Sequence, residues 1–195
     1  MTKKSLNLSI FKSFNSSRGF TILESIVAIF ILSLSVSGVF SSVQQSLFQA
    51  AIAKDEVKAF YLAQEAIEVI RNKRDVNQLN KINTGAGSWL DGITSACPFA
   101  TEAAKNTCTV DATNFEIVNC GINNWGSCIQ NLKQDSSTFR YGYNSSWSGT
   151  AFKREIQIEL VRNDEYGNPV EIAITVEVSW NGGKFKVKTH LFNWI

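Results

Sequence analysis

One ionisable side chain, Glu24, lies inside a long apolar stretch near the amino terminus. Residues 20–40 contain 21 amino acids, and Glu24 is the only charged one among them. As a helix this stretch would be about 31 Å long, roughly the thickness of the hydrocarbon core of a bilayer. A carboxylate at mid-bilayer costs on the order of 2.5–3.5 kcal/mol on insertion scales. Charge neutralisation would offset that cost, so Glu24 is a candidate functional residue.

A simpler interpretation of Glu24 is that it belongs to a helix cap. Thr21 and Glu24 have the spacing of a capping box, which would place Glu24 in the first helical turn, where the macrodipole favours an anion. This explains an acid near a helix start. It does not explain why the helix should start inside lipid, so both interpretations stay open.

Four cysteines form the second group of residues with potential chemistry. Two disulfides are expected if this part of the chain lies outside the cytoplasm. Three connectivities exist, and we favour the one whose two disulfides close the shortest loops. A zinc site is disfavoured because there is no Cys-x-x-Cys pair and the single histidine, His190, is remote. The favoured pairs are Cys97–Cys108 and Cys120–Cys128.

No set of residues indicates catalysis. There is no Ser/His/Asp set, glycine-rich phosphate loop or clustered carboxylate pair, so we predict no catalytic residue, no metal, no cofactor and no enzyme activity.

Three lysines near the carboxyl end could contact the phosphates of nucleic acid, but they fit better as the solvated face of an edge strand. These are Lys184, Lys186 and Lys188.

The elements around Glu24 begin with a basic leader, residues 1–19. It carries four cations and no acid, and without it 15 basic and 17 acidic side chains remain. The resulting charge of −2 disfavours nucleic acid as a partner of the mature chain. The cations before the apolar stretch predict a cytoplasmic amino terminus and an outer domain beyond residue 40. They are Lys3, Lys4, Lys12 and Arg18.

A secretory signal peptide is the main alternative for residues 1–40. Such peptides also have a basic region followed by an apolar one. The apolar stretch is long for a signal peptide, although a small-x-small pattern occurs at Ser35-Val36-Ser37. We favour a retained membrane helix.

A helix is expected to continue from residue 20 to about residue 75, since this range contains no proline. Residues 20–52 form its transmembrane and assembly half, and residues 53–74 its amphipathic half. Charged and polar residues lie on the opposite side of the latter from the apolar stripe, at Lys54, Lys58, Glu65 and Asn72. The stripe itself consists of Val57, Phe60, Ala63, Ile67 and Ile70.

The outer domain, residues 53–195, should add a sheet to this amphipathic half. Residues 76–150 are rich in Asn, Ser, Thr and Gly and predict a loop-heavy lobe, with strands near 115–119 and 138–143. Residues 152–193 alternate polar and apolar side chains between turn sequences, which predicts a three-stranded antiparallel meander. The fold class is therefore α+β, with one long helix packed on an antiparallel sheet.

Residues 19–24, Gly-Phe-Thr-Ile-Leu-Glu, closely resemble the processing motif of type IV prepilins and type II secretion pseudopilins. The resemblance implies a pilin-like fold and cleavage by prepilin peptidase between Gly19 and Phe20, followed by methylation of the new terminus. It also implies that Glu24 acts in assembly with other pilin subunits. The amine of Phe20 would lie four residues, about 6 Å of helix rise, from Glu24.

Residues 59–71 are similar to minor pilins, which have a comparable Leu-Ala-x-x-x-Ile-Glu-x-Ile-Arg stretch. Many major pilins have a proline about twenty residues into this helix, and Ser41 and its neighbours depart from that pattern. We therefore expect a minor pilin, held in the cytoplasmic membrane and then in a cell-surface or periplasmic filament. The alternatives are a secretion-type pseudopilin, a competence pilin contacting DNA, and an uncleaved bitopic protein with an outer binding domain.

Overall fold

The computed structural model describes residues 19–121 and 130–194. Within them it contains one helix, α1 (Ile22–Thr84), and eight strands in two antiparallel sheets. The chain divides into two compact units, one ending at Phe48 and the other beginning at Gln49. The expected α+β architecture, a long helix packed on an antiparallel sheet, is confirmed.

Helix α1 extends further than the sequence suggested. The predicted end near residue 75 is wrong: α1 ends at Thr84, and Gly85 follows it with a φ of 70°. The amide of Gly85 donates to the carbonyl of Lys81 at 2.8 Å, which closes the last turn in a left-handed cap. Residues 76–84 are polar but lack glycine and proline, so nothing in the backbone stops the helix before Gly85.

The main sheet has the strand order β2-β1-β6-β7-β8. Its last three strands, β6 (Lys153–Asn163), β7 (Pro169–Trp180) and β8 (Gly183–Phe192), form the meander predicted within residues 152–193. Ile156, Val176 and Val187 are directly opposite one another across these strands. The alternating pattern therefore predicted both the strands and the face that they bury.

The region 76–150 is less separate than its composition indicated. Strand β1 (Thr107–Asp111) was not predicted, and it joins the main sheet by pairing with both β2 (Glu116–Gly121) and β6. The strand expected near 115–119 corresponds to β2. The strand expected near 138–143 is only β4 (Tyr141–Gly142), which pairs with β3 (Lys133–Gln134); β3 also pairs with β5 (Ser148–Gly149).

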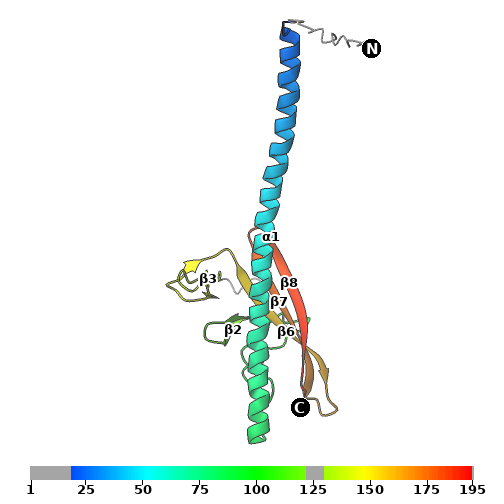
Figure 1. Cartoon of the computed structure of the whole chain (residues 1–195). Helices are drawn as coiled ribbons and strands as arrows, with labels where there is room; N and C mark the ends of the chain where they lie inside the picture. Colours follow the sequence, from blue (N-terminus) through cyan, green and yellow to red (C-terminus); the bar gives the residue numbers. More distant parts are fainter. Residues whose placement is uncertain (1–18, 122–129, 195) are drawn as a thin grey trace, which may run out of the picture. The chain divides into compact units, whose positions relative to one another are not determined.

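The core lies between the main sheet and the part of α1 that belongs to the second unit. Figure 1 shows this part of α1, drawn in cyan to green, running alongside β7 and β8. The predicted stripe is partly right, because Ala63, Ile67 and Ile70 are buried, whereas Val57 and Phe60 are exposed. The buried positions of α1 are Ala59, Leu62, Ala63, Ala66, Ile67, Val69, Ile70 and Gln78.

A buried arginine fastens α1 to the sheet. Arg154 of β6 is fully buried, and its Nη1 donates to the carbonyl oxygen of Leu62 at 2.9 Å and to Oε2 of Glu65 at 2.7 Å. Its Nη2 donates to the carbonyl oxygen of Val110 at 2.7 Å. Glu65 was expected on the solvent side of the helix, so this expectation is wrong: its side chain is turned toward the sheet by the charge of Arg154.

One disulfide joins the loop after α1 to the sheet. Cys97 and Cys108 are both buried and bonded to each other, which is one of the two pairings favoured from the sequence. Cys120 is also disulfide-bonded. The expected pairing of Cys120 with Cys128 involves a residue outside the described part of the chain.

Candidate processing and assembly site

Gly19 and Phe20 lie before the first turn of α1 and are exposed. Neither residue is in a helix or a strand, so the peptide bond between them has no ladder hydrogen bond to break. The backbone at this position is therefore accessible from solvent. The helix begins two residues later, at Ile22.

Thr21 caps this helix by accepting hydrogen bonds from main-chain amides of the first turn. Its Oγ1 accepts a hydrogen bond from the amide nitrogen of Glu24 at 3.2 Å, and its carbonyl oxygen accepts from the amide of Ser25 at 3.1 Å. The cap therefore uses the backbone of Glu24 rather than its carboxylate. Within residues 19–121 and 130–194 the exposed carboxylate has no hydrogen bond or ion pair. It is free to pair with a charge supplied from elsewhere.

The first unit consists of a helix whose apolar side chains are exposed all round. By length and composition α1 could cross a membrane, and none of its most apolar 18-residue window is buried. Of the residues from 19 to 48, only Ser25 is partly buried. The large exposed apolar residues are Ile22, Leu23, Ile26, Val27, Ile29, Phe30, Ile31, Leu32, Leu34, Val36, Val39, Phe40, Val43, Leu47 and Phe48.

The serines of this helix are compatible with an apolar environment. The hydroxyl of Ser33 donates to the carbonyl oxygen of Ile29 at 2.8 Å, and Ser35, Ser37, Ser41 and Ser46 bond in the same way four residues back. Each hydroxyl is thus satisfied within the helix. A polar group satisfied internally can enter lipid without the cost of an unmade hydrogen bond.

Two of the three lysines considered as a phosphate-binding patch contact acidic residues. Lys188 Nζ lies 2.7 Å from Oε2 of Glu159, and Lys184 Nζ lies 3.7 Å from Oε2 of Glu177. Lys186 also takes part in an interaction. His190 likewise contacts a glutamate, with Nδ1 2.8 Å from Oε1 of Glu171. The acidic partners offset the charges of Lys184 and Lys188, which weakens the case for contact with nucleic acid.

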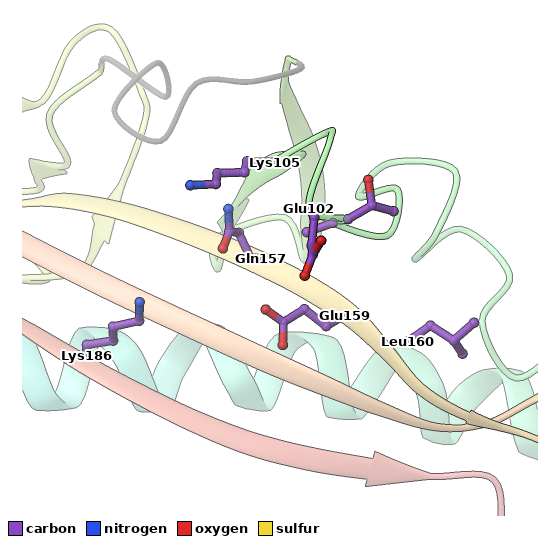
Figure 2. Close-up of a pocket in the computed structure, with 8 residues that line it drawn as sticks. Glu102, Lys105, Gln157, Glu159, Leu160 and Lys186 are labelled. Atoms are coloured by element: carbon purple, nitrogen blue, oxygen red, sulfur yellow. The ribbon is translucent and has the colours of Figure 1, made fainter.

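A polar cleft of about 540 Å³ lies on the same face of the sheet. Figure 2 shows the carboxylates of Glu102 and Glu159 and the ammonium groups of Lys105 and Lys186 around it. Charges of both signs line an open surface, which defines no particular ligand. Among the described residues no three His, Cys, Asp or Glu side chains come together as a metal site would require.

Arg154 is the important polar residue that the sequence analysis missed. A signal was present, because Arg154 stands in phase with Ile156 and Ile158 on the core face of β6. A charge at a core position of an alternating strand predicts a buried partner.

A comparison with protein families matches residues 14–40 to the prokaryotic N-terminal methylation motif. The match includes Gly19, Phe20, Glu24 and the first half of the exposed apolar helix. The chain thus carries the amino-terminal motif of a type IV pilin-like prepilin.

This motif supports a substrate of prepilin peptidase of the pilin or pseudopilin type, anchored in a membrane before it assembles with other pilins. Proteins of this kind are structural subunits. Comparisons with curated proteins and with solved structures found no match.

Proposed function

We propose that this protein is a structural subunit, a minor pilin, of a type IV pilus or related pseudopilus. Prepilin peptidase cuts between Gly19 and Phe20 and methylates the amine of Phe20. The observation that carries the proposal is the methylation motif at residues 14–40, which includes the start of an apolar helix that no other described residue covers. Lipid covers this helix before assembly, and the helices of other subunits cover it in the filament.

The role of Glu24 follows from its free carboxylate. Because Thr21 is already bonded to the Glu24 amide, the side chain is not needed for the cap. After cleavage the cationic amine of Phe20 lies about 6 Å of helix rise away. In a packed bundle of helices Glu24 neutralises this amine, either in its own subunit or in a neighbour.

The orientation follows from charge. The leader carries four basic residues and no acid, so the amino terminus stays in the cytoplasm and residues from Gln49 onward are outside. A buried disulfide at Cys97 and Cys108 fits an oxidising compartment. The paired lysines of β8 give no support to direct DNA contact, and nucleic acid is not among the proposed partners.

Analysis of sheared filaments tests the proposal. Assembled protein should start at methylated Phe20, as shown by the mass of its amino-terminal peptide.

Glu24→Gln keeps the cap because the bond to Thr21 uses the main chain. It removes one charge of a buried pair, which costs about 3–5 kcal/mol. The variant should therefore be trimmed and membrane-resident, but reduced by orders of magnitude in filaments.

Glu56→Gln is the matched control. Glu56 is exposed on the same helix, beyond the apolar stretch, and this change should leave incorporation at the wild-type level. Assembled material that retains residues 1–19 would show an uncleaved membrane protein instead. Normal recovery of Glu24→Gln in filaments would leave Glu24 without a role in assembly.

A further inference from the structure

Two phenylalanines of the outer domain have an unusual backbone and exposed rings. Phe115 has a φ of 57° and is 62% exposed, and Phe139 has a φ of 58° and is 70% exposed. This left-handed region favours glycine and asparagine, and it strains a bulky residue. They are the only two residues other than glycine with positive φ in the described part of the chain.

The two phenylalanines occupy the same position in loops of the same design. Each stands four residues after an aspartate, in the sequences Asp-Ala-Thr-Asn-Phe and Asp-Ser-Ser-Thr-Phe. Asp111 Oδ1 accepts from the amide and hydroxyl of Thr113, at 3.0 and 2.6 Å. These bonds hold the first loop in one shape before any partner arrives.

The second loop is held in the same way. Asp135 Oδ1 accepts from the amide of Ser137 at 3.0 Å, and its Oδ2 accepts from the hydroxyl of Thr138 at 2.6 Å. The bond from the Thr138 hydroxyl is the main cause that holds the pKa of Asp135 below its ordinary value. The amide of Phe139 donates to the carbonyl oxygen of Asp135 at 2.9 Å. The repeat of this design argues that each ring is held out for the same purpose.

Folding alone does not explain phenylalanine at these positions. A glycine or asparagine would satisfy the backbone without strain. In return, each phenylalanine still leaves well over half of its surface exposed. Strain with no compensation inside the fold indicates that the rings act on something outside it.

The first loop and the small sheet next to the second loop are neighbours. Gly142 of β4 packs so closely on the β1–β2 hairpin that a Cβ atom there would lie 3.0 Å from Cγ2 of Thr113. Tyr143 extends the contact, with its hydroxyl 2.8 Å from Oγ1 of Thr109. Phe115 also lines a cleft of about 390 Å³ beside α1, whose lining includes Val69 and the charged residues Glu68 and Arg71.

The loop tips indicate the chemistry of the partner. Residues 112–115 and 136–139 carry no charge, and beside them one cation, exposed Arg140, stands against the acids Asp111, Glu116 and Asp135. A surface that binds phosphate, in nucleic acid or lipid headgroups, needs a cluster of Lys or Arg. Several polar groups of the loops are already bonded within them, as at Thr113 and Thr138, and are not free to bind sugar hydroxyls. The rings are what the loops offer, so the partner presents an apolar recess of a protein.

The small size of the contact selects where that protein must be. Two phenylalanine rings bury at most about 300–500 Å². A specific complex formed from free proteins buries roughly 1,200 Å² or more. A contact this small is effective only where other interactions already hold the two surfaces together at high effective concentration. Packing of the apolar helices in a filament does so.

We propose that Phe115 and Phe139 anchor this outer domain in an apolar recess on the outer domain of the adjacent filament subunit. The contact rests on the proposed function as a filament subunit and adds to it a second interface, remote from Glu24. It acts after the helices have assembled and fixes how neighbouring outer domains sit against each other.

The test replaces both rings with a residue that accepts the same backbone. Phe115→Asn with Phe139→Asn keeps the left-handed conformation and removes the aromatic surface. Recovery of the full-length chain in sheared filaments should fall by about ten-fold for each ring. The melting temperature should stay the same or rise, because strain is removed. Tyr166→Asn is the matched control: Tyr166 is an exposed aromatic residue in another loop, without positive φ, and its loss should change neither quantity.

A photo-reactive phenylalanine analogue at position 139 identifies the contact directly. In cells it should crosslink to the outer domain of a filament subunit, and Glu24→Gln should abolish this crosslink. Crosslinks to lipid, to glycan or to a protein outside the filament would overturn the inference, as would a crosslink unaffected by Glu24→Gln.

The two proposals fail in different ways. Absence of the wild-type chain from filaments rejects the proposed function and this inference with it. Wild-type chain in filaments, with the double asparagine variant recovered equally well, rejects the inference alone. A lower melting temperature of the double variant would show that the rings serve folding.

Discussion

The two parts of helix α1 are built for different surroundings. In the unit that ends at Phe48, leucines such as Leu34 are 59% exposed, and apolar side chains occur all round the helix. In the unit that begins at Gln49, Leu62 is only 4% exposed, and buried residues form one stripe. A helix that is apolar all round needs cover on every side, whereas a striped helix needs it on one.

The source of the cover accounts for the difference. The stripe is covered by the main sheet of the same chain, and small residues such as Ala59, Ala63 and Ala66 let the sheet approach closely. The described residues before Gln49 have no such partner in their own chain. The comparison teaches that the described part of the second unit covers its own helix, whereas the apolar helix of the first unit is left exposed and, in the proposed function, is covered by lipid and other subunits.

The largest expected effect on stability comes from removing Arg154, which connects α1 to the sheet. Arg154→Met leaves Glu65 without its partner and removes the hydrogen bonds that Arg154 donates to the carbonyl oxygens of Leu62 and Val110. The change removes three hydrogen bonds from a buried charged donor, each worth roughly 1.5–3 kcal/mol, and burial of the Met side chain offsets part of the loss, so the net destabilisation should be about 3–5 kcal/mol. The free energy of unfolding of the second unit, measured in urea, should fall by this amount. In the control Arg162→Met, which removes an exposed arginine 3.8 Å from Glu171, the loss should be below about 1 kcal/mol.

A second, slightly smaller effect compares the two halves of the helix directly. Leu62→Ala should destabilise the second unit by about 2–5 kcal/mol, because it opens a cavity in the core. The same change at exposed Leu34 should leave the free energy of unfolding of the second unit within about 0.5 kcal/mol of the wild-type value. Equal losses at the two positions would contradict the division into a self-covered and an uncovered half.

The smallest expected effect concerns how the stability of the second unit changes in acid. We expect an aspartate in one of its loops to contribute to this change. A hydrogen bond from the Asn168 side chain is the main cause that holds the pKa of Asp164 below its ordinary value of 3.8. A lowered pKa stabilises the fold above pH 3.8, and this contribution is lost as the pH falls through the lower, folded-state value.

Comparison of melting temperatures at pH 6 and pH 2.5 measures this contribution. Asp164→Asn should make the difference between the two temperatures slightly smaller than in the wild type. Glu165→Gln, in the same loop, should leave the difference unchanged. An unchanged difference in Asp164→Asn would show that Asp164 makes no contribution to acid sensitivity.

Alternating patterns were predictable from the sequence because they arise from local geometry. The side chains of β6, β7 and β8 alternate between faces, and a two-residue turn at Asn181-Gly182 joins the last two strands. Strand β1 escaped detection because Thr107 and Thr109, polar residues that alternate with Cys108 and Val110, are also buried. Thr109 enters the interior by donating to the carbonyl oxygen of Arg154 at 3.0 Å, a partner 45 residues away. Such a long-range partner leaves no local signal.

The sequence by itself determined the amino-terminal motif, the apolar helix that begins at Ile22 and the meander of β6 to β8. Each depends on residues close together in the chain: a capping threonine, a continuous apolar stretch or a period of two. Tertiary structure alone decided the place of β1 beside β6, the burial of Arg154 against Glu65 and the exposure of Phe115 and Phe139. These features depend on which surfaces meet in space, and the same residue types could have been exposed or buried had other elements packed against them.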